Sequence, residues 1–73
     1  MDRFDGNTVR SLRVKKGCRR EQLAVATGRS LQTIWRWERG SAIPTVDDLA
    51  RLADALDAPL DAFFVNDVEA LSA

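Results

Sequence analysis

A chain of 73 residues builds one domain with a modest core, and its hydrophobic share of 45% and charged share of 30% argue against disorder, collagen-like repeats and membrane proteins. The single cysteine, Cys18, cannot form an internal disulfide. Because the chain has no histidine, it lacks the usual nitrogen ligand of zinc and the usual general base near neutral pH, so zinc binding and most catalysis are not expected. The net charge of zero conceals an asymmetry: residues 1–40 hold ten Arg/Lys against four Asp/Glu, giving +6, and residues 41–73 hold one against seven, giving −6.

The first predicted helix runs from about Thr8 to Lys16 and is rich in basic residues. Asp5 or Asn7 is suited to cap its start, and Gly17 ends it. A basic first helix fits the charge of the N-terminal half, which is able to face phosphates while the acidic half points elsewhere.

Two short helices follow, and only a few residues separate them. The first spans Arg20 to Thr27 and stops at Gly28, and the second begins after Ser30 as its N-cap. It runs from Leu31 to about Arg39 and ends at Gly40. This spacing is typical of a helix-turn-helix.

Residues 46–56 form the most strongly patterned helix of the chain. Thr45 caps it, and Asp48 stands three positions on, as in a capping box. Apolar residues then recur at helical spacing: Leu49, Leu52, Ala53 and Leu56.

A last short helix is predicted to start at Pro59 and to supply Leu60, Phe63 and Phe64 to the core. We therefore assign residues 1–65 to one helix-turn-helix domain and residues 66–73 to a tail. Val65, Val68 and Leu71 extend an apolar stripe into this tail. This C-terminal part is the expected dimer interface, and a frayed tail on a monomer is the alternative.

The helix from Leu31 is predicted to bury Ile34 and Trp37. Its other side presents four residues outward: Leu31, Gln32, Trp35 and Arg36. Gln pairs with adenine, Arg with guanine, and Leu covers a thymine methyl. Trp35 packs either against bound DNA or against a neighbouring loop, and Leu31 either contacts a base or folds back onto its own turn.

Arg19 and Arg20 place two positive charges at a helix N-terminus, which is itself an anion site. Such a pair costs stability unless an anion arrives, so we interpret both as phosphate contacts rather than as a solvated face.

Taken together, residues 9–64 closely resemble the Cro/phage-repressor (XRE) type of helix-turn-helix domain. The resemblance is carried by Leu23–Ala24, the Gly28 turn, TIWRWERG ending at Gly40, Pro44, and the helix ending at Leu56. It implies an all-α, lambda-repressor-like bundle of five helices.

The resemblance also implies residue roles. DNA-contacting positions of the family map onto eight residues: Arg19, Arg20, Leu31, Gln32, Thr33, Arg36, Arg39 and Ser41. We assign base reading to Leu31, Gln32, Thr33 and Arg36, together with Trp35. Phosphate binding is assigned to the other four: Arg19, Arg20, Arg39 and Ser41. The family often joins an arginine of the first helix to the glutamate near the end of the third, which implies an Arg13–Glu38 ion pair here. Cys18 takes the place of a buried aliphatic residue, so we expect a small core residue there.

We therefore expect a sequence-specific regulator of transcription, and specifically a repressor. One short helix reads only a few base pairs, which favours a homodimer on palindromic double-stranded DNA. A protein-interaction module such as an antitoxin is the alternative. No nucleophile lies beside a base and no phosphate loop is present, so no enzymatic activity and no cofactor are expected. The first residues lack a secretory signal and the longest apolar runs span four residues, which predicts a cytoplasmic protein that does not enter membranes.

Overall fold

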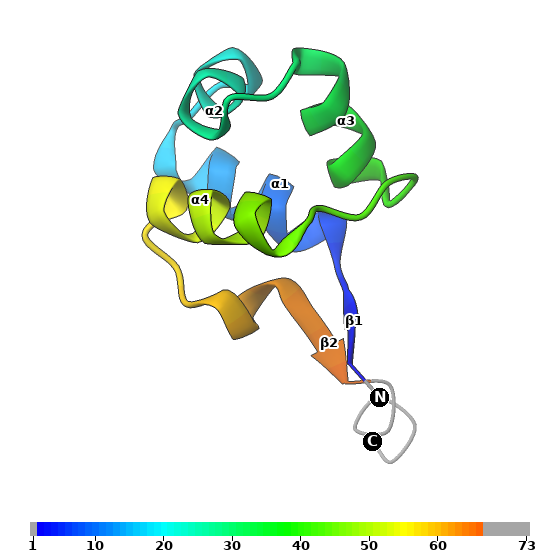
Figure 1. Cartoon of the computed structure of the whole chain (residues 1–73). Helices are drawn as coiled ribbons and strands as arrows, with labels where there is room; N and C mark the ends of the chain where they lie inside the picture. The colour runs from blue at the N-terminus through cyan, green and yellow to red at the C-terminus, as the bar shows by residue number, and fades with distance from the viewer. Residues whose placement is uncertain (1, 67–73) are drawn as a thin grey trace.

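The computed structural model of the chain describes residues 2–66, so Val68 and Leu71 of the predicted tail lie outside the described residues. The elements follow in the order β1 (Asp2–Phe4), α1 (Gly6–Lys16), α2 (Arg20–Thr27), α3 (Leu31–Arg39), α4 (Val46–Leu56), η1 (Leu60–Phe63, a 3-10 helix) and β2 (Phe64–Asn66). Helices α2 and α3 lie at one end of the molecule and the two strands at the other, with α1 and α4 between them (Figure 1).

Helix α1 begins at Gly6, about two residues before the predicted start. Asp5 is the cap, because its carboxylate accepts a hydrogen bond from the backbone N–H of Asn7 at 3.1 Å and from the Thr8 hydroxyl at 3.2 Å. Glycine is a poor helix former, so the sequence alone gives no reason to include Gly6. The predicted end at Gly17 is confirmed.

The predicted helix-turn-helix is confirmed in both its helices and its turn. Gly28 ends α2 with φ of 70°, a left-handed conformation that costs glycine no steric strain. Its backbone N–H donates to the carbonyl groups of Ala24 and Val25. Ser30 then starts α3, since its hydroxyl accepts a hydrogen bond from the backbone N–H of Thr33 at 3.1 Å.

One hydrophobic core joins all four α-helices to η1. Its buried residues are Val9, Leu23, Ala24, Ile34, Trp37, Leu49, Leu52, Leu56 and Phe63, with Cys18 partly buried against them. Helices α1 and α2 each pack against both α3 and α4. The predicted core positions on α3 and α4 are confirmed, and Cys18 lies beside the core as expected.

The prediction of a fifth α-helix after Pro59 is wrong. The chain makes only the four-residue 3-10 helix η1 and then extends into β2. Strand β2 pairs with β1 in antiparallel register, with Phe4 opposite Phe64 and Arg3 opposite Val65. The extended form prevails because it gives the backbone of β2 hydrogen-bond partners in β1, while Phe63 still fills the core. Leu60 and Phe64, also expected in the core, are instead exposed at its edge.

Candidate nucleic-acid interface

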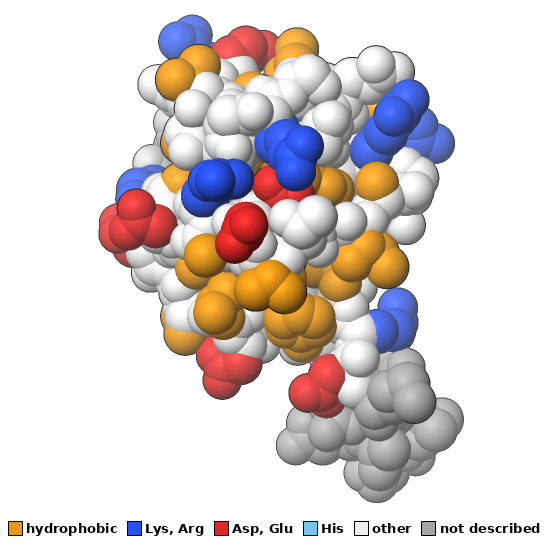
Figure 2. Space-filling view, in the orientation of Figure 1, with side chains coloured by type: hydrophobic (Ala, Val, Ile, Leu, Met, Phe, Trp, Pro, Cys, Tyr) orange, Lys and Arg blue, Asp and Glu red, His pale blue; other side chains and the backbone are white. Residues whose placement is uncertain are grey.

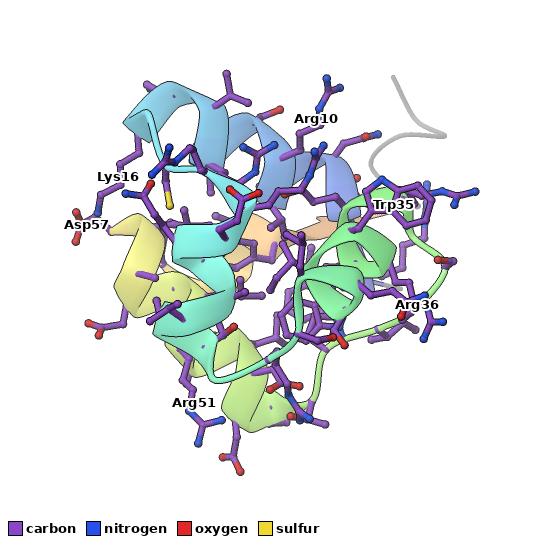
Figure 3. All side chains as sticks on the ribbon, turned by 90° about the horizontal axis from the view of Figure 1, so that it is seen from above. Arg10, Lys16, Trp35, Arg36, Arg51 and Asp57 are labelled. Carbon is purple, nitrogen blue, oxygen red and sulfur yellow. The ribbon has the colours of Figure 1, made fainter. Side chains whose placement is uncertain are left out.

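Helix α3 divides its residues between core and solvent as predicted. Ile34 and Trp37 are buried, whereas Gln32 and Arg36 are exposed. Viewed from above in Figure 3, Trp35 and Arg36 lie on the outer side of this helix. An exposed carboxamide and an exposed guanidinium on one helix offer the paired donors and acceptors that base edges require.

Two large apolar side chains on α3 are also exposed. Leu31 keeps 45% and Trp35 keeps 44% of its surface in contact with solvent. Both line a hollow of about 450 Å³ together with Arg20, Glu21 and Gln32. Both side chains are therefore available for contact with a partner. The guanidinium of Arg39 lies over the indole of Trp35, 4.2 Å from the ring centroid.

Thr33, predicted to read bases, is drawn into the cap of α3. Its hydroxyl lies 2.9 Å from the hydroxyl of Ser30, and the residue is half-buried. Ser41 stands at the other end of the helix, where its backbone N–H and its hydroxyl both donate to the carbonyl of Arg36, at 3.0 and 3.3 Å. Ser41 is thus tied to the last turn of α3, the helix that holds the residues predicted to read bases.

The two arginines at the start of α2 differ in their surroundings. Arg19 is the exposed N-cap, and its backbone N–H donates to the side-chain oxygen of Gln22 at 2.8 Å. Arg20 donates from Nε to Oε1 of Glu38 at 3.0 Å. Glu38 therefore supplies Arg20 with an internal counter-charge, and the phosphate contacts of both arginines stay a prediction.

Glu38 joins three helices through one carboxylate. Its side chain is 3% exposed, and it accepts hydrogen bonds from Nε of Arg13 at 2.7 Å and from Nη2 of Arg13 at 3.3 Å, besides the bond from Arg20. Arg13 also donates to the carbonyl of Cys18 at 3.0 Å. The pair implied by the sequence thus extends into a network that fixes α1, α2 and the end of α3 relative to one another.

A second ion pair that the sequence did not reveal holds the turn between α2 and α3. Arg29 donates from Nε and Nη2 to the two carboxylate oxygens of Asp48, at 2.8 and 3.1 Å. Asp48 is buried in the first turn of α4, where it also accepts from the N–H of Thr45. The hydrogen bond from Arg29 is the main reason that the pKa of Asp48 lies below its ordinary value.

Two further features concern residues 2–66, the part of the chain that the structure describes: a metal-binding cluster and a membrane span. In this range no group of three or more His, Cys, Asp or Glu residues is placed to hold a metal ion. The same range has no helix long and apolar enough to cross a bilayer.

Similar proteins also contain a helix-turn-helix domain. A family model described as a helix-turn-helix domain matches residues 6–63. Uncharacterized HTH-type transcriptional regulators of Rickettsia conorii and Rickettsia prowazekii are each 36% identical over 64 residues, which make up 88% of this chain but 51% and 49% of those proteins. The chain thus spans about half the length of these curated relatives.

Two solved structures are similar over most of both chains. The restriction-modification controller protein C.AhdI from Aeromonas hydrophila has a TM-score of 0.75 at 32% identity, over 81% of this chain and 89% of that one. The P22 c2 repressor, solved in complex with a synthetic operator, has a TM-score of 0.78 at 30% identity, over 84% and 92%. These similarities point to a family of regulators rather than to an enzyme.

Proposed function

Because the chain belongs to the helix-turn-helix domain family, we propose that it is a DNA-binding regulator of transcription that reads base edges in the major groove with the exposed side of α3. One observation carries this proposal: Gln32 and Arg36 stand exposed on a helix whose opposite side is locked into the core by Ile34 and Trp37. A rigid helix with exposed bidentate side chains is what direct readout requires.

The proposed roles follow from where each side chain lies. Gln32 and Arg36 make the base-specific hydrogen bonds, while Leu31 and Trp35 cover apolar parts of the bases and Thr33 contributes next to the cap. Phosphates are bound at the two ends of the motif by four residues: Arg19, Arg20, Arg39 and Ser41. Phosphate contacts set the register of the helix, and base contacts set the sequence.

Repression is the proposed direction of regulation. The similar P22 protein is named a repressor and was solved with operator DNA. A small domain bound over a promoter competes with the transcription machinery for the same DNA, and this competition requires only DNA binding. The cytoplasm is the proposed location, because the similar regulators are proteins of organisms without a nucleus.

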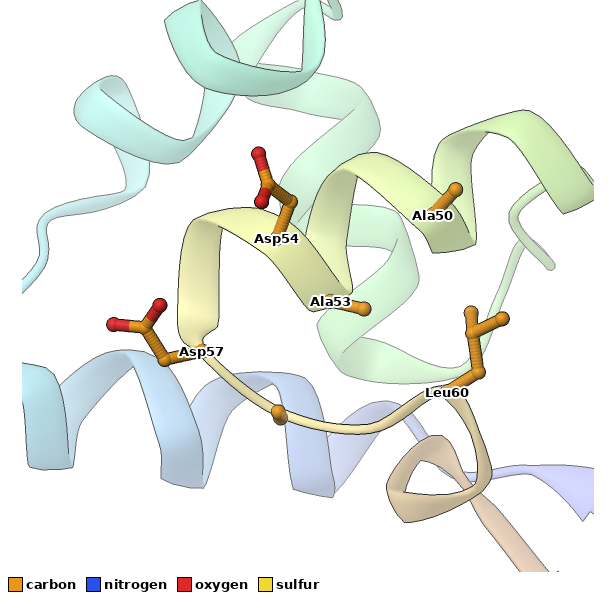
Figure 4. Close-up of a pocket in the computed structure, with 6 residues that line it drawn as sticks. Ala50, Ala53, Asp54, Asp57 and Leu60 are labelled. Atoms are coloured by element: carbon orange, nitrogen blue, oxygen red, sulfur yellow. The ribbon is translucent and has the colours of Figure 1, made fainter.

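A homodimer on a palindromic operator is part of the proposal. The predicted interface after Pro59 is no longer an α-helix, but it still exposes Leu60 and, less fully, Phe64. Leu60 borders a surface hollow with Ala50 and Ala53 of α4 (Figure 4). Apolar side chains gather on this part of the molecule, away from the end formed by α2 and α3 (Figures 1 and 2). A second copy docked there leaves both α3 helices free to face DNA.

Selection of bound sequences from a random pool of DNA duplexes tests the proposed function. The full chain is expected to enrich a short motif, and a two-fold repeat of that motif supports the dimer. If repeated rounds enrich no sequence while the chain remains folded, sequence-specific regulation is wrong and the interaction module becomes the better account.

A further inference from the structure

A cleft of about 300 Å³ lies between the start of α1 and the end of α3. Three helices contribute its six lining residues: Asn7, Arg10, Arg20, Trp35, Glu38 and Arg39. Of these, Arg10 and Asn7 belong to no part of the interface proposed above. Seen from above, Arg10 lies on the same side of the molecule as Trp35 and far from Arg51 on α4 (Figure 3).

The charges of this cleft favour an anion. Three guanidinium groups line it against the single carboxylate of Glu38, and that carboxylate is already bonded to Arg13 and Arg20. Arg10 is exposed, and within the described residues it makes no ion pair. Arg20 uses Nε for Glu38, which leaves its Nη groups for another acceptor. Guanidinium groups that line one cleft offer several N–H donors to the oxygens of a phosphate.

Trp35 forms the wall between this cleft and the base-reading side of α3. Its indole lines the cleft on one side and, on the other, the hollow shared with Leu31 and Gln32. The guanidinium of Arg39 lies over the Trp35 ring, so the indole also positions this cation. A phosphate held in the cleft is thereby placed next to the bases that α3 reads.

We propose that this arginine cleft binds one backbone phosphate of the DNA duplex, with Arg10 and Arg39 as donors beside Arg20 and with Trp35 as the spacer between phosphate and bases. The inference rests on the proposed function and adds to it a residue of α1 that the family resemblance did not indicate. It makes α1 part of the DNA-binding surface.

The salt dependence of DNA binding measures this contact directly. Each phosphate neutralised contributes about 0.9 to the slope of log K against log salt concentration. Arg10→Ala should therefore lower the magnitude of the slope by about 0.9. Between 50 and 200 mM salt the wild-type chain should then lose about 3.5-fold more affinity than the variant. A duplex of random sequence suffices, because phosphate contacts do not depend on sequence.

Arg51→Ala is the matched control, since it removes the same charge from the far side of the molecule and should keep the wild-type slope. A slope for Arg10→Ala equal to that of the wild type overturns the proposal, and so does an equal reduction in Arg51→Ala, which indicates an effect of net charge alone.

Failure of the proposed function itself is recognised separately. If the wild-type chain binds no duplex at all, both proposals about DNA are wrong. Titration with inorganic phosphate, followed by the NMR signal of the Trp35 indole N–H, then tests the cleft alone. A signal that moves in the wild type and not in Arg10→Ala shows an anion site for a free phosphate; a signal that stays in place removes the anion site as well.

Discussion

Nε of Arg13 and Oε2 of Glu38 lie 2.7 Å apart although 25 residues separate them in the sequence. Both side chains are buried, and the same carboxylate also accepts from Arg20. One glutamate of α3 thus fixes how α1 and α2 are placed around it. The position of the side chains that we propose to read bases therefore depends on a buried ion-pair network at the end of their helix.

Replacing Glu38 with Gln is expected to destabilise the fold by as much as about 3–5 kcal/mol, because it leaves the Arg13 guanidinium buried without its counter-charge. Urea unfolding gives this free energy. The double variant Arg13→Met with Glu38→Leu removes both buried charges and should be considerably more stable than the single variant. A single variant that costs less than about 1 kcal/mol indicates a solvated pair instead.

The ion pair of Arg29 with Asp48 predicts a dependence of stability on pH. The folded state lowers the pKa of Asp48 below its ordinary 3.8, mainly through the hydrogen bond from Arg29, so folding favours the ionised carboxylate. Its stabilisation is fully present above the unfolded pKa and is lost as the pH falls through the lower folded pKa.

The free energy of unfolding, measured between pH 6 and pH 2.5, should therefore fall more steeply in the wild type than in Arg29→Ala. Arg51→Ala is the control, because Nη1 of Arg51 lies 3.9 Å from Asp48 and Arg51 is not among the causes of the pKa shift. Parallel curves for the wild type and Arg29→Ala contradict this account of the turn.

Gly6 lies where the start of α1 packs against the backbone at the end of α3. A Cβ atom at this position collides with the carbonyl oxygen of Trp37 and lies 2.9 Å from that of Glu38. Gly6→Ala should thus destabilise the chain by about 1–3 kcal/mol, although alanine is the better helix former. Ser11→Ala, on the exposed side of α1, should leave the thermal midpoint unchanged or slightly raised. A Gly6→Ala variant more stable than the wild type rules out this tight contact.

Local signals were sufficient to predict four of the helices. Apolar spacing and caps lie within a few residues of one another, as in α4 with Thr45 and Asp48. Strands β1 and β2 carry no such signal, because each has three residues and its partner lies about sixty residues away in the sequence. The helix predicted after Pro59 failed for this reason.

The same distinction holds for the candidate site. The helical wheel of α3 separated Gln32 and Arg36 from the buried Ile34 and Trp37, since that separation depends only on spacing. The contacts of Arg20 with Glu38 and of Arg29 with Asp48 depend on how helices pack, and the charges alone allow many pairings. Arg10 was missed because only the packed structure brings it to a cleft with residues of α2 and α3.

A dimer through the hollow beside Leu60 predicts a specific effect of charge. Leu60→Asp should leave the monomer folded, because this side chain is 48% exposed, but should prevent a second copy from docking. Sedimentation with a palindromic duplex should give two chains per duplex for the wild type and weaker, stepwise binding for the variant. Val25→Asp, on α2 at 85% exposure, is the control. Unchanged pairing in Leu60→Asp places the interface elsewhere, and a version truncated after Asn66 then tests the tail.

The central claim, that the exposed side of α3 reads bases, is tested most directly by the affinity of Arg36→Ala for two duplexes, one carrying the selected motif and one of random sequence. Loss of a bidentate base contact should cost about 1–3 kcal/mol on the selected duplex and little on the random one, so the ratio of the two affinities falls by about fivefold or more. Equal losses on both duplexes, or an unchanged ratio, contradict base reading by this helix.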